Sequence, residues 1–141
     1  VVFTKSLDLP SKSNLWDCSK AKTLVIYDSS TANENYLNRI PQCVEVEKIS
    51  SDNPELISKI LAKRGCNKVL WECGPRLATA AIKSNCIQEI ITFIAPKILG
   101  GENSMNPFED FEFKEMNEII QLNMSQISLI GNDICVKSSF E

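Results

Sequence analysis

The sequence contains no histidine, and this absence excludes several kinds of chemistry. With no imidazole among its 141 residues, the chain itself cannot supply a Ser-His or Cys-His nucleophile pair, a histidine-ligated zinc or an imidazole proton shuttle. Glycine and proline are also scarce, at five and six residues, whereas 43% of the residues are apolar. This composition predicts one compact domain with its own core rather than a disordered or repetitive chain.

The sequence also lacks a basic cluster and a long apolar run. Its 15 Lys and Arg residues are scattered and are outnumbered by 18 Asp and Glu residues, which gives a net charge of -3. We therefore expect no nucleic-acid partner. No apolar run approaches the roughly 20 residues that cross a bilayer, so we expect no membrane association.

The six cysteines are widely spaced and form no CxxC pair. They could be the disulfide framework of a secreted protein or small apolar side chains in a reducing compartment. The spacing and the size of the chain favour the second interpretation, which predicts buried, reduced cysteines in a cytoplasmic enzyme. The residues are Cys18, Cys43, Cys66, Cys73, Cys86 and Cys135.

Short apolar runs alternate with helical patterns along the first two thirds of the chain. The runs that predict strands are 1–5, 23–27, 43–46, 68–72 and 87–93. A short polar helix is expected near 33–39, and the clearest helix begins at Pro54 after Asn53 and ends at Gly65. The next helix follows Pro75 and ends near Asn85.

The remaining third reads as two strands, 119–130 and 134–140, around the turn sequence Gly131-Asn132-Asp133. The predicted class is α/β, with a mixed, mainly parallel sheet flanked by helices and a C-terminal antiparallel hairpin. Residues 68–93 are expected to form a right-handed βαβ unit. No repeat or linker divides the sequence, so residues 1–141 are interpreted as a single domain.

The sharpest local feature is the junction Glu72-Cys73-Gly74-Pro75-Arg76. Open α/β sheets bind ligands at the carboxyl ends of their strands, where Glu72 is expected, and Gly74 allows backbone to approach a ligand. The free amides at the start of the following helix predict a phosphate or pyrophosphate site, reinforced by Arg76. The alternative is an ordinary helix start, with Arg76 paired to a nearby carboxylate.

A second feature is the run Ile-Ala-Pro-Lys-Ile-Leu-Gly-Gly at 94–101. By itself it is typical of a loop whose glycines need positive φ. Together with Val-Leu-Trp-Glu-Cys-Gly-Pro-Arg-Leu-Ala at 69–78, however, it resembles the reductase domain of bacterial riboflavin deaminase-reductases. The opening Val-Val-Phe-Thr-Lys-Ser-Leu-Asp-Leu-Pro is similar to that family's central strand and the loop after it.

The resemblance implies a dihydrofolate-reductase-like fold and a pyrimidine reductase domain whose opening segment lies upstream of Val1. It implies NADPH-dependent reduction of 5-amino-6-(5-phosphoribosylamino)uracil to the ribitylamino product, in a homodimer. Glu72 would contact the substrate, and no metal is implied. The cofactor phosphates would be held by Gly74, Pro75, Arg76, Leu77, Ala78, Thr79 and Ala80.

Two other functions remain open. A related reductase could act on a pterin or another diaminopyrimidine. Alternatively, the chain could be a non-catalytic remnant or dimerisation module, since its hairpin carries apolar residues able to pair across a two-fold axis. These residues are Ile127, Leu129, Ile130, Ile134, Val136 and Phe140. Covalent catalysis by Cys73 is disfavoured because no histidine can activate it.

Overall fold

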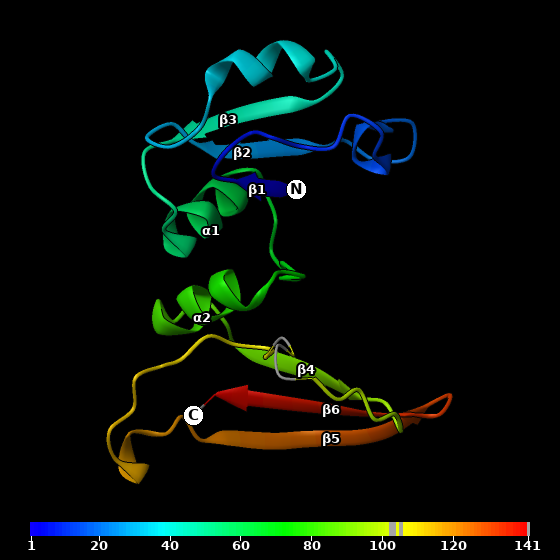
Figure 1. Cartoon of the computed structure of the whole chain (residues 1–141), viewed down its shortest axis with the longest axis vertical. Helices are drawn as coiled ribbons and strands as arrows, with labels where there is room; N and C mark the ends of the chain where they lie inside the picture. The colour runs from blue at the N-terminus through cyan, green and yellow to red at the C-terminus, as the bar shows by residue number, and fades with distance from the viewer. Residues whose placement is uncertain (102–103, 105, 141) are drawn as a thin grey trace. The chain divides into compact units, whose positions relative to one another are not determined.

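The computed structural model describes residues 1–101, 104 and 106–140. It divides the chain into two compact units, Val1–Ile57 and Ser58–Glu141, and each unit contains one three-stranded sheet (Figure 1). One sheet is parallel and the other is antiparallel. The predicted α/β class with strands of both orientations is therefore confirmed.

The sheet of the first unit is parallel and has the order β1-β2-β3. Its strands are β1 (Val2–Thr4), β2 (Leu24–Asp28) and β3 (Glu45–Ile49). All five residues of β2 are buried, as expected for the central strand of a parallel sheet, where both faces are covered. The first two strands match the prediction, whereas β3 begins two residues later than the apolar run at 43–46 indicated.

One hydrophobic cluster of this unit lies on the face of the parallel sheet that carries Val25 and Tyr27. Two short 3-10 helices, η1 (Asn14–Trp16) and η2 (Glu34–Arg39), supply part of its cover. The buried residues of the cluster are Leu7, Val25, Tyr27 and Val44, and the partly buried ones are Leu9, Trp16, Cys18, Ala32, Tyr36, Leu37 and Ile40. Each fully buried large apolar side chain contributes about 1.5–3 kcal/mol relative to exposure, so this cluster is a major source of stability.

The two α-helices end in the same way. Helix α1 (Pro54–Lys63) crosses the boundary between the units, and α2 (Pro75–Lys83) belongs to the second. After α1, Gly65 has φ 87 and Cys66 N-H donates to the Leu61 carbonyl at 3.0 Å. After α2, Asn85 takes the equivalent position with φ 52. Both are Schellman endings, which confirms the two predicted helix ends.

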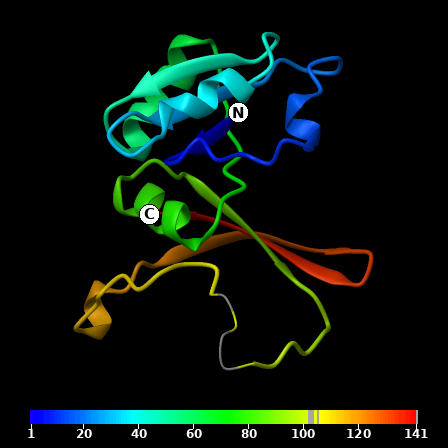
Figure 2. The ribbon, with the colours of Figure 1, turned by 45° about the horizontal axis from the view of Figure 1, so that its top comes forward.

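The sheet of the second unit is antiparallel and has the order β4-β6-β5. Its strands are β4 (Glu89–Ile94), β5 (Leu122–Ile130) and β6 (Asp133–Phe140). Strands β5 and β6 form the predicted hairpin (Figure 2), closed by a two-residue turn in which Gly131 has φ 61. A positive φ at the first central position is typical of a type II′ turn.

The segment 68–72 differs from its prediction. It is not a strand, and the side chains of Val69 and Leu70 are 39% and 72% exposed. Among the described residues, β4 pairs only with the antiparallel β6, so the expected parallel βαβ unit is also wrong. An apolar run favours extended backbone, but a strand also needs a neighbouring strand to accept its hydrogen bonds.

The antiparallel sheet presents an apolar face to its surroundings. Residues directly opposite one another, and residues two apart, point to the same side of a sheet. The register pairs Ile127 with Val136 and Leu129 with Ile134, and Ile127 and Leu129 are 61% and 76% exposed. A bulge between Met124 and Gln126 keeps Met124 on this same face. The apolar pattern of these strands therefore does not produce burial.

Two further expectations concern the cysteines and membranes. None of the six cysteines is buried: Cys43 and Cys66 are exposed and the others are half-buried, so the prediction of buried cysteines is wrong. All six are free thiols. In the described part of the chain, no helix has the length and apolar character needed to cross a membrane.

Candidate functional site at the start of helix α2

The first turn of α2 has backbone donors with no partner inside the helix. The N-cap is Gly74, with φ -72 and ψ 170, and no side chain caps it. Ala78 N-H donates to the Gly74 carbonyl at 3.1 Å, so the intrahelical ladder begins there. Of the four N-H positions before it, Pro75 has none, which leaves the amides of Gly74, Arg76 and Leu77. Three amides and the positive helix end can therefore face an anion.

Space is open directly above this turn. A Cβ built on Gly74 would meet nothing within 4 Å, and its φ is not one that requires glycine. Conformation therefore does not explain the glycine at this position. Close approach of a ligand to the backbone would explain it, because only glycine leaves the peptide fully accessible.

Arg76 extends from this turn without an ionic partner. The side chain is exposed, and among the described residues no ion pair involves it. A cation in the first turn opposes the helix dipole by about 0.3–1 kcal/mol. The interpretation that Arg76 pairs with a nearby carboxylate is therefore disfavoured, and a bound anion would relieve the opposition.

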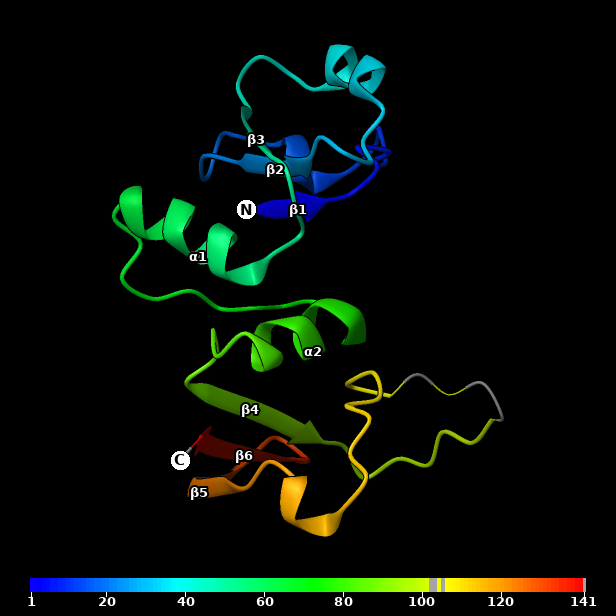
Figure 3. The ribbon, with the colours of Figure 1, turned by 90° about the vertical axis from the view of Figure 1, so that its left-hand side faces the viewer.

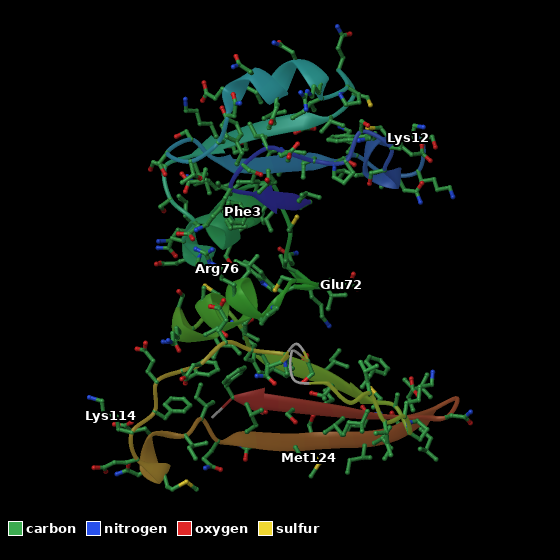
Figure 4. All side chains as sticks on the ribbon, viewed as in Figure 1. Phe3, Lys12, Glu72, Arg76, Lys114 and Met124 are labelled. Carbon is green, nitrogen blue, oxygen red and sulfur yellow. The ribbon has the colours of Figure 1, made fainter. Side chains whose placement is uncertain are left out.

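Glu72 precedes the turn and is exposed. The sequence predicted Glu72 at the end of a strand. This prediction is wrong, because 68–72 is not a strand. Figure 4 shows Glu72 and Arg76 extending in different directions from the chain, so the structure does not bring them together. Burial raises the pKa of the neighbouring Cys73 thiol, which keeps it protonated and argues against a thiolate nucleophile.

The remaining predicted cofactor residues divide between two turns of α2. Leu77 and Ala78 are half-buried and follow directly on the open turn, and Ala80 is half-buried further along. Thr79 is 4% exposed, and its Oγ1 accepts a hydrogen bond from Glu109 N-H at 2.9 Å. The Thr79 hydroxyl is therefore engaged with the protein, whereas the amides of the first turn are not.

The contact to Thr79 belongs to a segment that the sequence did not single out. Phe111 stacks on Phe113 with centroids 5.3 Å apart, and Lys83 Nζ lies 5.6 Å from the Phe111 centroid. These contacts attach the segment around 108–113 to Thr79 and Lys83 of α2, and Figure 3 shows this segment in yellow below α2. The repeated phenylalanines in Phe-Glu-Asp-Phe-Glu-Phe at 108–113 are the sequence feature that could have indicated this packing.

The second motif, at 94–101, begins with the last residue of β4 and continues as an exposed loop. Lys97 N-H donates to the Ala95 carbonyl at 2.8 Å, and Gly101 has φ 145. The side chains of Ile98 and Leu99 are 103% and 89% exposed. The structure thus supports the interpretation of this run as a loop that uses glycine for its backbone conformation.

These features define a mixed α/β protein in which helix α2 begins without a side-chain cap. Comparison with known families then gives the particular one. The chain belongs to the RibD C-terminal domain family, whose model matches residues 1–136. The resemblance to riboflavin deaminase-reductases is thereby confirmed.

Curated relatives are riboflavin biosynthesis proteins. The chain is 35% identical over 136 residues to the chloroplastic protein PYRR of Arabidopsis thaliana, covering 96% of the chain and 23% of PYRR. It is 38% identical over 135 residues to RibD of a Synechocystis strain, covering 94% of the chain and 36% of RibD. The chain therefore spans only part of each relative.

Solved structures share the fold. RibD of Acinetobacter baumannii matches with a TM-score of 0.78 at 17% identity, over 99% of this chain and 36% of that one. A pyrimidine reductase-like protein of Corynebacterium diphtheriae matches with a TM-score of 0.78 at 22% identity, over 99% of this chain and 59% of that one. These matches confirm the dihydrofolate-reductase-like reductase-domain fold.

Proposed function

We propose that this chain is the reductase domain of a riboflavin-biosynthesis enzyme and that NADPH is its cofactor. The substrate we assign is 5-amino-6-(5-phosphoribosylamino)uracil, which is reduced to the ribitylamino product. Membership of the RibD C-terminal domain family supports the pathway and the reductase role. The observation that carries the cofactor assignment is the uncapped start of α2.

The residues at the start of α2 fit a dinucleotide's diphosphate. The amides of Arg76 and Leu77 point out of the first turn as donors, and the open space at Gly74 allows phosphate oxygens to approach. The Arg76 guanidinium adds a cation with no carboxylate to neutralise it among the described residues. When bound, the nicotinamide supplies a hydride; the chain's own contribution is to hold and orient the reactants.

The test is isothermal titration of NADPH into the 141-residue chain and, in parallel, into the full natural polypeptide. Arg76→Ala should weaken binding by about 1–3 kcal/mol, because a charge-assisted hydrogen bond is lost. Lys59→Ala, which removes a cation on α1, is the matched control and should leave the affinity unchanged. If NADPH bound neither the 141-residue chain nor the full natural polypeptide, the proposal would be contradicted.

A substrate assay separates the related reductases. With the full natural polypeptide, loss of NADPH absorbance should require the phosphoribosylamino pyrimidine. Glu72→Gln should raise the KM for that pyrimidine with little effect on NADPH affinity, because we assign Glu72 to the substrate. Turnover with a pterin in its place would favour the alternative reductase.

A second candidate function, assembly into a homodimer, is favoured by the exposed apolar face of β4-β6-β5. Leu129 is 76% exposed and Ile94 52%, and exposed contiguous apolar surface is typical of an interaction site. The face would meet its symmetric copy across a two-fold axis.

Sedimentation velocity tests this candidate. The chain should sediment as a dimer, and Leu129→Lys should shift it to a monomer by burying a charge at the interface. Ser128→Lys, on the opposite side of the same strand, is the control and should remain dimeric. A wild-type chain that stays monomeric at all concentrations would overturn the assembly proposal and leave the reductase proposal standing.

A further inference from the structure

Two of the six cysteines are brought together in the first unit, although they are far apart in the chain. Strands β2 and β3 begin side by side, since the register pairs Leu24 with Glu45 and Glu45 N-H donates to the Thr23 carbonyl at 2.9 Å. Cys18 lies in the segment that leads into β2, and Cys43 lies in the segment that leads into β3. Strand pairing therefore carries both cysteines to the same end of the parallel sheet.

Hydrogen bonds hold the two segments around the sulfur atoms. Thr23 Oγ1 donates to the Leu15 carbonyl at 2.9 Å, and Cys43 Sγ donates to the Trp16 carbonyl at 3.9 Å. The thiols of Cys18 and Cys43 also hydrogen-bond to each other, and this bond, followed by burial, raises the pKa of Cys18. The two sulfur atoms are therefore in contact while both thiols are still reduced.

The two thiols differ in their access to solvent. Cys43 is exposed, whereas Cys18 is half-buried and packs against the cluster that contains Val25 and Tyr27. A reagent in solution therefore reaches Cys43 first, and Cys18 lies directly behind it. An accessible thiol with a second thiol beside it is the arrangement of an attacking and a resolving cysteine.

We propose that Cys18 and Cys43 are a site of reversible oxidation by a low-molecular-weight disulfide such as glutathione disulfide. The Cys43 thiolate attacks one sulfur of the reagent, whose S-S bond breaks, and the departing glutathione takes up the proton that Cys43 released. Cys18 then gives up its proton, and its sulfur displaces the second glutathione from Cys43. Two cysteine thiols are thereby oxidised to one disulfide, and one glutathione disulfide is reduced to two thiols.

The new bond would close a loop that contains all of β2 and η2. Closing a loop restricts the unfolded chain more than the folded one, and the effect grows with the length of the loop. The oxidised chain should therefore unfold at a temperature about 10 °C higher than the reduced chain. This site is separate from the start of α2, and it does not depend on the reductase activity.

Peptide mapping tests the proposal on the unmodified 141-residue chain. The chain is treated with excess glutathione disulfide, its remaining thiols are alkylated, and trypsin releases the peptides 13–20 and 40–48, each with one cysteine of the pair. Mass spectrometry should find these two peptides joined, and dithiothreitol should separate them. Cys18 and Cys43 recovered as alkylated thiols, or joined to other cysteines as often as to each other, would overturn the site.

Variants separate the two roles. Cys18→Ser should leave Cys43 carrying one glutathione, because no second thiol displaces it, whereas Cys43→Ser should leave Cys18 unreacted. Cys66→Ser removes the other exposed cysteine and should change neither the linkage nor the rise in unfolding temperature. A linked chain that unfolds at the temperature of the reduced chain would overturn the stabilisation. The NADPH titration at α2 can fail or succeed whatever the result here.

Discussion

Strands β2 and β5 are both rich in apolar residues, yet their environments are opposite. All five residues of β2 are buried, whereas β5 is exposed except at one half-buried position. The first lies at the centre of a parallel sheet, and the second is the edge strand of an antiparallel sheet. The comparison shows that an apolar run predicts a strand, but the elements packed on both faces decide how much that strand stabilises the fold.

The largest effect should come from a matched pair of isoleucines in these two strands. Ile26 is 0% exposed and Ile127 is 61% exposed. Ile26→Ala should lower the free energy of unfolding by about 2–5 kcal/mol, because it leaves a cavity in the core. Ile127→Ala should change it by no more than about 0.5 kcal/mol when the chain is diluted to the monomer, because the side chain then has little contact to lose. Urea unfolding measures both, and similar losses for the two variants would remove the distinction between the sheets.

A smaller effect is expected from the two helix ends, which share one geometry but use different residues. Gly65→Ala should lower the free energy of unfolding by about 1 kcal/mol, because alanine is strained at φ 87. No further loss is expected, since a Cβ at this position meets no atom within 4 Å. Asn85→Gly should instead stabilise by about 0.5 kcal/mol, since glycine adopts positive φ more readily. Thermal unfolding should shift in opposite directions for the two variants. A shift in the same direction would contradict the shared geometry.

The smallest effects should come from one surface ion pair in each unit. A hydrogen bond from Lys48 lowers the pKa of Glu34, helped by the Tyr27 hydroxyl, and a hydrogen bond from Lys137 lowers the pKa of Glu89. A carboxyl with a lowered pKa stabilises the fold above its unfolded pKa of about 4.3. This contribution is lost as the pH falls through the lowered value.

Glu34→Gln and Glu89→Gln should therefore be slightly less stable than the original chain at pH 7. Both differences should shrink to nothing as the pH falls below about 4. Urea unfolding at several pH values measures this. If the original chain instead gained stability over the variants on acidification, the protonated carboxyls would stabilise the fold more than the carboxylates do, which would contradict the lowered pKa values.

Much of the fold was predictable because its signals are local. The buried run at 23–27, the Asn53-Pro54 helix start, the Gly65 helix end and the Gly131-Asn132 turn all depend on residues close in the chain. The segment 68–72 shows the limit: its apolar residues predict a strand, but the strand has no partner among the described residues. Pairing is a property of distant segments that periodicity cannot report.

The candidate site was predictable to a similar extent. Gly-Pro followed by a helical pattern located the open turn at Gly74, and the structure confirms that turn as uncapped. The bond from Glu109 to Thr79 spans 30 residues, and nothing near Thr79 in the chain indicates it.

The central claim is that the peptide groups at Gly74 contact the phosphates of the cofactor, and titration of NADPH into Gly74→Ala tests it most directly. The new methyl group meets only open space and an allowed φ, so stability should fall by no more than about 1 kcal/mol, the cost of alanine at an N-cap. Affinity for NADPH should fall at least about tenfold, because the methyl occupies the place of a phosphate oxygen. A folded variant that binds NADPH as tightly as the original chain would contradict the account.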